Sequence, residues 1–377
     1  MNQKDPKYNF ALVREMLRAP EIISSFNFNG EGSSSTATGN EGSSPAATRN
    51  QIGKIVASIK QTGRLFCTGE GSSRIFPSKR LIASMLKRCG SQQGCSLSGG
   101  LSFQIATEGG RQALDYDLSG WTVMGASNSG QTKELIVLFE KLIDENHKLG
   151  KGAALPRPAT LFGLTATPGS KLTQVAESIV LRCGKEEAVA ATMSVVEQAL
   201  VYQAIEIGLS GCTCASQQQK AGQLAAGVLA EEYDADLIAK VAAAPVIYLA
   251  GRNNGVAEEL ALKANEITRK RSQYLEGTIV VHGIEEVMNP EDVVVLIEPF
   301  EQDMEFYKKN LVDGVGMTVV AISSKPTLFP TITVPTLKCF DEYFQLLAGW
   351  NLLVHTGIAC GIDIDKPKRA RKVGNAY

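Results

Sequence analysis

Short runs of Val, Ile, Leu and other apolar residues recur along the chain, and most are followed by a longer stretch with the apolar spacing of a helix. Such runs predict buried strands, and their alternation with helices predicts parallel sheets covered on both faces. The predicted strands are residues 64–69, 101–107, 121–127, 159–167 and 178–183 in a first round, and 245–251, 293–299 and 318–323 in a second. Two rounds indicate an α/β chain with two doubly wound domains in tandem.

The segments around these rounds predict how the chain is divided. Residues 7–24 have a helical apolar period, whereas residues 29–48 are nearly all small or polar and predict a loop or linker. The Ala-rich residues 216–243 are expected to be helical and to separate the two rounds, and the helix after the strand 245–251 is expected to reach residue 271. The expected parts are an N-terminal helix with its Ser/Gly-rich loop (1–50), a first domain (51–215) and a second domain with a C-terminal tail (216–377).

Charge and cysteine usage exclude some classes of partner. The 377 residues have a formal net charge of −1 and a pI of about 6.4, so no global basic field exists for nucleic acid or an anionic membrane. No apolar run has the length of a membrane span, and the first ten residues lack a signal-peptide pattern. The eight cysteines are scattered, and Cys212 and Cys214, the only close pair, have poor zinc-site spacing. We expect reduced thiols, no metal or cofactor, and a cytoplasmic location.

Two loops rich in glycine and hydroxyl groups follow predicted strands. Residues 69–74 read GEGSSR, and residues 127–132 read SNSGQT at the start of a predicted helix. In doubly wound sheets ligands bind beyond the carboxyl ends of strands, where glycine exposes backbone amides and a helix N-terminus favours an anion. Either loop alone is as well explained by turns and helix caps. The presence of both favours a phosphate site.

A dinucleotide is the alternative ligand for the first loop, because its glycine pattern resembles a dinucleotide fingerprint. That fingerprint needs an acidic residue about twenty positions later, at the end of a second strand. Residues 88–99 read KRCGSQQGCSLS and contain none. The sequence therefore argues against a nucleotide.

The loop at residues 127–132 is similar to the S-x-S-G-x-T phosphate loop of the sugar isomerase (SIS) domain family. The chain most resembles the isomerase half of glucosamine-6-phosphate synthase and related amino-sugar-phosphate deaminases, isomerases and fructosamine-phosphate deglycases. The resemblance is carried by residues 66–73, 123–132, 166–178, 186–192, 259–268, 280–288 and 361–373, in the family's order. It implies two tandem SIS domains, each with a five-stranded parallel sheet, and assembly as a homodimer.

The resemblance also implies a substrate site. The residues expected to surround a sugar phosphate are Ser72, Ser73, Ser127, Asn128, Ser129 and Thr132, with Gly71, Val189 and Ala191 expected to contact the substrate. The corresponding loop of the second domain, residues 251–254, has no hydroxyl side chain, so one phosphate site per chain is implied.

Four residues match the family's catalytic positions. Glu266 would move a proton between C1 and C2 and Lys263 would stabilise negative charge, while His282 would open the sugar ring, reaching into the neighbouring subunit. Lys372, in the tail, would form a Schiff base or close over the site. Without the resemblance, Lys263 and Glu266 would be interpreted as a surface helix pair and the basic tail as solvated. His147 and His355, the other two histidines, are expected to be structural.

Departures from the family narrow the expected activity. Residues 189–193 read VAATM where the family has V-A-S-T-K, and Asn128 replaces a glutamine. The chain begins Met1-Asn2 without a cysteine nucleophile, so we do not expect a glutamine-dependent synthase. The favoured function is an aldose–ketose isomerase or deaminating isomerase of a hexose 6-phosphate, with an amino sugar preferred. The alternatives are a fructosamine-6-phosphate deglycase and a non-catalytic phosphosugar-binding regulator.

Overall fold

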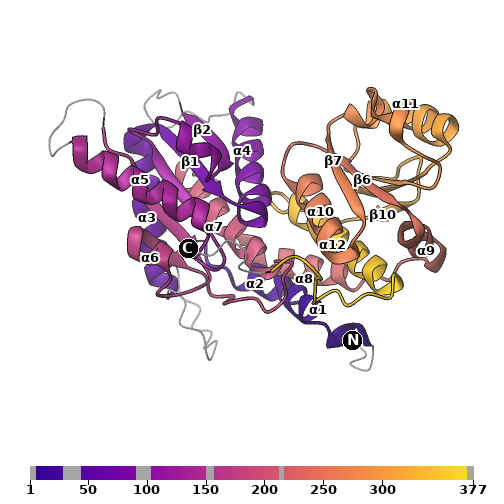
Figure 1. Cartoon of the computed structure of the whole chain (residues 1–377), viewed down its shortest axis with the longest axis horizontal. Helices are drawn as coiled ribbons and strands as arrows, with labels where there is room; N and C mark the ends of the chain where they lie inside the picture. Colours follow the sequence, from indigo (N-terminus) through magenta and orange to yellow (C-terminus); the bar gives the residue numbers. More distant parts are fainter. Residues whose placement is uncertain (1–5, 29–43, 91–102, 150–156, 212–215, 372–377) are drawn as a thin grey trace. The chain divides into compact units, whose positions relative to one another are not determined.

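The computed structural model describes residues 6–28, 44–90, 103–149, 157–211 and 216–371, with the backbone alone for residues 88–90. The chain forms two compact lobes (Figure 1). The first lobe contains the described residues between 25 and 186 and between 193 and 218. The second lobe contains residues 6–24, 187–192 and 219–371.

The first lobe is built on a parallel sheet with the strand order β2-β1-β3-β4-β5. Its strands are β1 (Arg64–Gly69), β2 (Gln104–Gly109), β3 (Thr122–Ala126), β4 (Thr160–Thr165) and β5 (Glu177–Val180). All five predicted strands of the first round are confirmed, although β2 begins three residues later than expected. The order places β1 between β2 and β3, so the strand order reverses beside the first loop.

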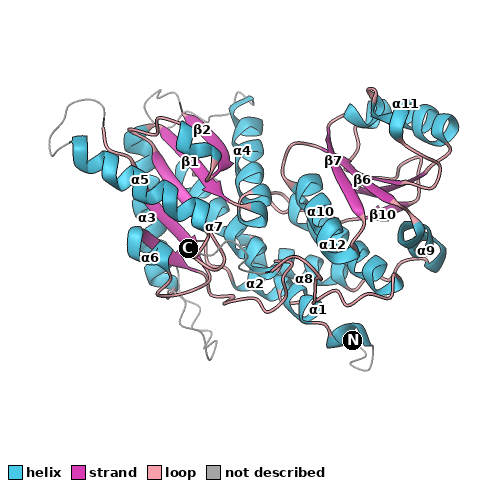
Figure 2. Cartoon of the chain, viewed as in Figure 1, coloured by secondary structure: helices cyan, strands magenta, loops and turns pink. Residues whose placement is uncertain are grey.

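Helices enclose this sheet, as Figure 2 shows. They are α3 (Pro45–Thr62), α4 (Ile75–Gly90), α5 (Lys133–Leu149), α6 (Lys171–Val175) and α7 (Met193–Ser210), with short 3-10 turns at η2 (Gly71–Ser73) and η3 (Gln112–Asp115). Apolar residues of α5, including Leu135 and Phe139, pack on Phe66 and Val123 of the sheet. The prediction that residues 29–48 are all loop is wrong at its end, because Ser44 caps α3 and Pro45 begins it.

The second lobe repeats the topology of the first. Its parallel sheet has the order β7-β6-β8-β9-β10, with strands β6 (Val246–Gly251), β7 (Arg271–Glu276), β8 (Val293–Ile297), β9 (Thr318–Ser323) and β10 (Thr331–Thr333). Sequence patterns found β6, β8 and β9 but missed the two edge strands, because β7 is largely polar and β10 has three residues. The two parallel sheets flanked by helices confirm the predicted architecture.

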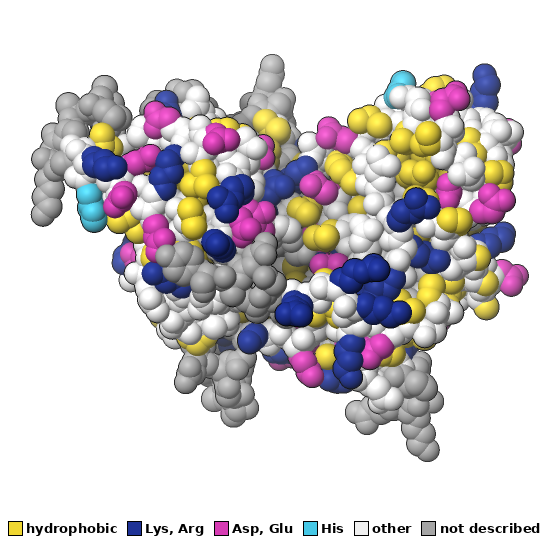
Figure 3. Space-filling model, in the orientation of Figure 1, with side chains coloured by type: hydrophobic (Ala, Val, Ile, Leu, Met, Phe, Trp, Pro, Cys, Tyr) yellow, Lys and Arg dark blue, Asp and Glu magenta, His cyan; other side chains and the backbone are white. Residues whose placement is uncertain are grey.

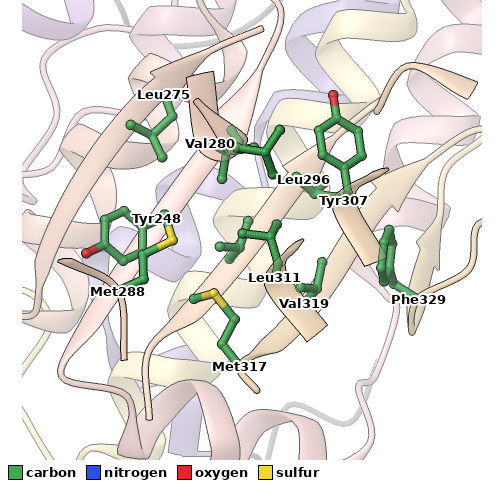
Figure 4. Close-up of a cluster of buried hydrophobic side chains, with 13 residues drawn as sticks. Tyr248, Leu275, Val280, Met288, Leu296, Tyr307, Leu311, Met317, Val319 and Phe329 are labelled. Atoms are coloured by element: carbon green, nitrogen blue, oxygen red, sulfur yellow. The ribbon is translucent and has the colours of Figure 1, made fainter. Parts of the chain in front are cut away.

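The helices of the second lobe include two π-helical segments. The elements are α8 (Gln218–Leu229), α9 (Ala235–Ala243), α10 (Val256–Lys263), η5 (π, Ala264–Thr268), η6 (Ile279–Val281), η7 (Ile284–Val287), η8 (Glu301–Asp303), α11 (Met304–Tyr307), η9 (π, Lys308–Val315) and α12 (Asp341–Ala359). The predicted helix to residue 271 is too long, because Arg269 has φ 59° and β7 starts at Arg271. Tyr307 and Leu311 cover one face of the sheet, packing with Tyr248 and Leu296 (Figure 4).

The N-terminal helices belong to the second lobe. These are α1 (Ala11–Met16) and α2 (Ala19–Ser25), after a short 3-10 turn η1 (Pro6–Asn9). The carboxylate of Asp365 accepts hydrogen bonds from the backbone N–H groups of Ala11 (2.7 Å) and Leu12 (2.9 Å). An acidic side chain at a helix N-terminus satisfies amides that have no partner within the helix. The start of the chain is thereby attached to the segment that leads to its C-terminal tail.

The surface carries charges of both signs, and the described cysteines include both free and disulfide-bonded residues. Acidic and basic side chains both occur over each lobe on the face shown in Figure 3. No helix in the described part of the chain combines the length and apolar character that crossing a membrane requires. Cys67, Cys183 and Cys360 are free thiols. Cys339 is disulfide-bonded, so the expectation that all the cysteines are reduced is wrong for that residue.

Candidate functional site

The two hydroxyl-bearing loops lie at the ends of neighbouring strands of the first sheet. Gly69, the last residue of β1, pairs with Ala126, the last residue of β3. The turn η2 follows β1 after one residue, and Ser127 follows Ala126 directly. In open α/β sheets this is the edge and the reversal point where ligands bind. The structure therefore brings together Ser72 and Ser73 on one strand end and the loop 127–132 on the next.

The loop 127–132 is held by its own hydroxyl groups. The Ser127 Oγ lies 2.8 Å from the Thr132 Oγ1 and accepts a hydrogen bond of 3.0 Å from the Gly130 N–H. The Ser129 Oγ accepts a hydrogen bond of 3.2 Å from the Gln131 N–H. The loop turns directly into the seventeen-residue helix α5. Hydroxyl groups and a helix N-terminus are together suited to a phosphate monoester.

Gly130 makes this turn possible. Its φ is +61°, a left-handed conformation that costs other residues about 1–2 kcal/mol. A Cβ atom on Gly130 would also lie 2.0 Å from the Oγ of Ser170, at the start of α6. The loop therefore packs tightly against the end of β4 and the helix that follows. Ser170 itself is 2% exposed.

Asn128 is bound to a buried carboxylate that the sequence analysis missed. Its Nδ2 donates to the Oε2 of Glu186 over 3.1 Å, and Glu186 is 1% exposed. The same carboxylate accepts hydrogen bonds from the Ser194 N–H (3.3 Å) and the Ser194 Oγ (2.6 Å). Asn128 therefore anchors the loop to the start of α7. Glu186 lies within the stretch 186–192 that carries the resemblance, but its side chain had no assigned role.

A second buried side chain supports the first loop. Gln198, on α7, has no exposed surface, and its Nε2 lies 3.4 Å from the Oγ of Ser73. Ser72 is nearly buried at 9% exposure, and Gly71 has φ +54°. The helix α7 thus supports both loops. Ser194 near its start binds Glu186, which holds Asn128, and Gln198 one turn later contacts Ser73.

Lys263 and Glu266 are in direct contact in the second lobe. The Lys263 Nζ lies 2.7 Å from the Glu266 Oε2 and 3.1 Å from the Oε1 of Glu259. The side chains of Lys263 and Glu259 are 1% and 0% exposed, whereas that of Glu266 is 25% exposed. One carboxylate of this three-residue cluster can therefore be reached from solvent. Glu259 was missed, although its position four residues before Lys263 is the usual helical spacing for an ion pair.

The cluster keeps the lysine charged. Burial lowers the pKa of Lys263, but the negative charges of Glu259 and then Glu266 outweigh burial and raise the pKa above its ordinary value. Lys263 is therefore an ammonium ion at neutral pH. An ammonium ion can stabilise a developing oxyanion but cannot act as an amine nucleophile.

His282 lies on another segment of the same lobe. It follows the turn η6, is exposed, and its ring centroid is 6.2 Å from that of Phe306 on α11. Three exposed apolar side chains come from η6, η7 and α11: Ile279 (49%), Val287 (62%) and Phe306 (43%).

Three predicted site residues remain: Val189 and Ala191, which precede α7, and Lys372 in the tail. Val189 and Ala191 are half-buried in the segment 187–192, which packs with the second lobe. Glu15 of α1 holds this segment by accepting hydrogen bonds from the Glu187 N–H and, over 3.2 Å, from the Ala188 N–H. Lys372 lies outside the described residues, which end at residue 371.

Comparisons with known proteins establish the fold. No family model matches the chain. In an alignment 283 residues long that covers 66% of this chain, the chain is 27% identical to the glutamine–fructose-6-phosphate aminotransferase (isomerizing) of Aeropyrum pernix. The match spans 42% of that curated relative.

Two solved structures share the whole architecture. The C-terminal domain of glucosamine-fructose-6-phosphate aminotransferase from Francisella tularensis covers 97% of this chain and 99% of its own, with a TM-score of 0.69 and 18% identity. Tagatose-6-phosphate ketose/aldose isomerase from Escherichia coli covers 96% and 98%, with a TM-score of 0.71 and 16% identity. The chain therefore has the fold of phosphosugar isomerases, as the resemblance to tandem SIS domains predicted.

Proposed function

We propose that this chain is an aldose–ketose isomerase or deaminating isomerase acting on a hexose 6-phosphate, with an amino sugar as the preferred substrate. The observation that carries the proposal is the pair of hydroxyl-bearing loops on neighbouring strand ends of the first sheet. Ser72, Ser73, Ser127, Ser129 and Thr132 bind the phosphate in this proposal. The similarity to phosphosugar isomerase structures supports the choice of ligand.

Four of the expected contacts take secondary roles. The side-chain amide of Asn128 donates to Glu186, so we assign Asn128 the role of anchoring the phosphate loop. Gly71 allows the substrate to approach the first loop closely. Val189 and Ala191 contact the sugar carbons through backbone and small apolar groups.

Glu266 transfers the proton between C1 and C2. It removes the C2 proton of the open-chain aldose while O1 gains a proton, which gives a cis-enediol, or an enolamine from an amino sugar. It then returns a proton to C1 while the proton on O2, or on the amino nitrogen, is released. Its partial exposure makes it the member of the cluster that a substrate can reach. Lys263 stabilises the negative charge that develops on the C1–C2 oxygens, and buried Glu259 keeps Lys263 protonated and in position.

His282 opens the sugar ring, in the site of a neighbouring subunit. An imidazole can donate and accept a proton near neutral pH, which ring opening needs. The exposed side chain of Phe306 next to the His282 ring supports a homodimer interface on this surface. Lys372 of the tail closes over the substrate or forms a Schiff base with it. The proton transfers in this scheme use protein side chains alone.

Deuterium exchange tests the proposal. The protein is incubated in D2O with glucosamine 6-phosphate, fructose 6-phosphate or tagatose 6-phosphate, and deuterium at C1 or C2 is followed by NMR. We expect exchange with at least one substrate, loss of at least ~100-fold in rate for Glu266→Gln, and no change for the exposed control Glu305→Gln. Binding of a sugar phosphate without exchange would instead identify a non-catalytic phosphosugar-binding regulator.

Product analysis then separates the related activities. An isomerase interconverts the two sugars and releases no nitrogen. A deaminating isomerase releases ammonia from glucosamine 6-phosphate, and a deglycase releases a free amino acid from a fructosamine 6-phosphate. Glutamine-dependent synthesis of the amino sugar should not be detected with this chain alone.

A further inference from the structure

Ser127 and Glu298 occupy equivalent positions in the two sheets. In the first sheet Ala126 pairs with Leu164, and the next residue, Ser127, donates its N–H to the Leu164 carbonyl over 2.9 Å. In the second sheet Ile297 pairs with Ile322, and the next residue, Glu298, donates its N–H to the Ile322 carbonyl over 2.8 Å. The strand orders also correspond. The residue that begins the phosphate loop of the first lobe is thus replaced by a glutamate in the second.

The Glu298 carboxylate accepts hydrogen bonds from three groups. The Ser324 N–H lies 3.0 Å from Oε2, the Ser324 Oγ lies 2.7 Å from Oε1, and the Gln345 Nε2 lies 3.2 Å from Oε2. Ser324 follows β9, and Gln345 is on α12 and only 5% exposed. A backbone amide, a hydroxyl and a side-chain amide that converge at a strand end form the kind of donor set that binds a small oxyanion.

The backbone of Glu298 is strained in this arrangement. Its φ is +44°, one of three non-glycine residues in the left-handed region among the residues described. Glutamate gains nothing locally from this conformation, which side chains with a Cβ atom rarely adopt. The strain is offset by the hydrogen bonds that the carboxylate accepts after the chain has turned.

In both lobes, a glutamine near the start of the last helix (α7 or α12) donates its side-chain amide to a residue that follows a strand. In the first lobe, Gln198 near the start of α7 donates its side-chain amide to Ser73 at the strand end. In the second lobe, Gln345 near the start of α12 donates its side-chain amide to Glu298. The two amides act at different strands, because Ser73 follows β1 whereas Glu298 follows β8, the counterpart of β3. The second lobe therefore has a strand-end donor set of its own, with one of its own carboxylates bound there.

We propose that Glu298 is the built-in occupant of an anion site at the carboxyl edge of the second sheet. Its carboxylate fills the position that a phosphate or small carboxylate would take, and its charge repels a second anion. Glu298 therefore restricts phosphosugar binding to the first lobe and makes the two similar lobes functionally different. For its meaning in catalysis, this inference rests on the phosphate-binding role proposed for the first lobe.

The test removes the carboxylate without adding backbone strain. Glycine adopts positive φ freely, so Glu298→Gly in the full chain should fold with the donors of Ser324 and Gln345 left open. Equilibrium dialysis with inorganic phosphate should show one additional phosphate per chain relative to the unmodified protein. Thermal unfolding should show a saturable rise in Tm with propionate, which replaces the missing side chain, and no such rise with neutral propionamide.

Two glycine variants serve as controls. Arg269→Gly removes another left-handed residue, with φ 59°, and Glu301→Gly removes an exposed acid from the same loop. Neither should gain a phosphate or respond to propionate. If the unmodified protein binds no phosphate but Glu298→Gly binds one, the proposed function fails and this inference stands. If Glu298→Gly gains no phosphate and propionate and propionamide act alike, this inference is wrong.

Glu298→Gln provides a second measurement in case the glycine variant does not fold. Glutamine keeps the size of the side chain, but an NH2 donor replaces one of the two acceptor oxygens, and both oxygens of Glu298 accept hydrogen bonds. Its Tm should be lower than that of the unmodified protein, and the loss should shrink when Ser324 is also changed to alanine, because the mismatch then involves one donor fewer. A Tm equal to that of the unmodified protein would contradict the role of the charge.

Discussion

The carboxyl edges of the two sheets have the same strand arrangement but opposite chemistry. After β3 the first lobe presents small hydroxyl side chains on a glycine-containing turn, whereas after β8 the second lobe presents Glu298, Glu301 and Asp303. The strand orders and the pairing at the strand ends correspond, so the sheet topology does not account for the difference. The comparison shows that a fold provides the position of a site, and the side chains placed there determine what it binds.

The largest effect is expected at the buried charges of α10 in the second lobe. Lys263→Met removes the ammonium between two carboxylates, one of them fully buried, and should lower the free energy of unfolding by roughly 3–5 kcal/mol in a urea titration. Because folding raises the pKa of Lys263, the contribution of this residue is complete below the lysine's ordinary pKa and is lost at more alkaline pH.

An exposed ion pair provides the control for that prediction. Lys308→Met breaks a pair with Asp313 at 3.1 Å, the same distance as the pair of Lys263 with Glu259, but both side chains are about half exposed. Lys308→Met should lower the free energy of unfolding by at most about 1 kcal/mol, because water solvates the remaining carboxylate. Equal costs for the two variants would show that burial is not what distinguishes Lys263.

An intermediate effect is expected at the turn of the phosphate loop. Gly130→Ala adds left-handed strain and a contact with Ser170, and should cost about 2–4 kcal/mol and weaken sugar-phosphate protection against thermal unfolding. Gly169→Ala is the matched control, since Gly169 has φ +66° but no atom within 4 Å of an added Cβ. Gly169→Ala should lower the free energy of unfolding only by the left-handed backbone strain, about 1–2 kcal/mol. Similar losses would mean that the approach of Ser170 does not constrain the loop.

The smallest effect is expected at Glu301, an exposed acid at the carboxyl edge of the second sheet. Glu301 is exposed and pairs with Lys325 at 2.8 Å, a hydrogen bond that lowers the pKa of Glu301. Glu301→Gln should leave the Tm unchanged at physiological ionic strength, because solvent and salt screen such pairs. A clear loss of Tm would mean that acids of this loop act together and would weaken the special role given to Glu298.

Local patterns were sufficient for the central strands and insufficient at the edges. The apolar run of β8 is buried at every position and was found from sequence alone. Strand β7 was not predicted, because its largely polar sequence has no apolar alternation. Its pairing with β6 defines it instead. The helix before it was predicted too long, since the left-handed turn at Arg269 has no glycine or proline signal.

For the candidate site, the sequence determined which chemical groups follow each strand. The two hydroxyl-bearing loops and the spacing of Lys263 and Glu266 can be identified from neighbouring residues alone, because they depend on short segments. The tertiary structure decided which partners those groups have. Asn128 is bound by a carboxylate 58 residues later, and Glu298 by donors 26 and 47 residues later. Such contacts depend on burial and long-range packing, which local periodicity does not encode.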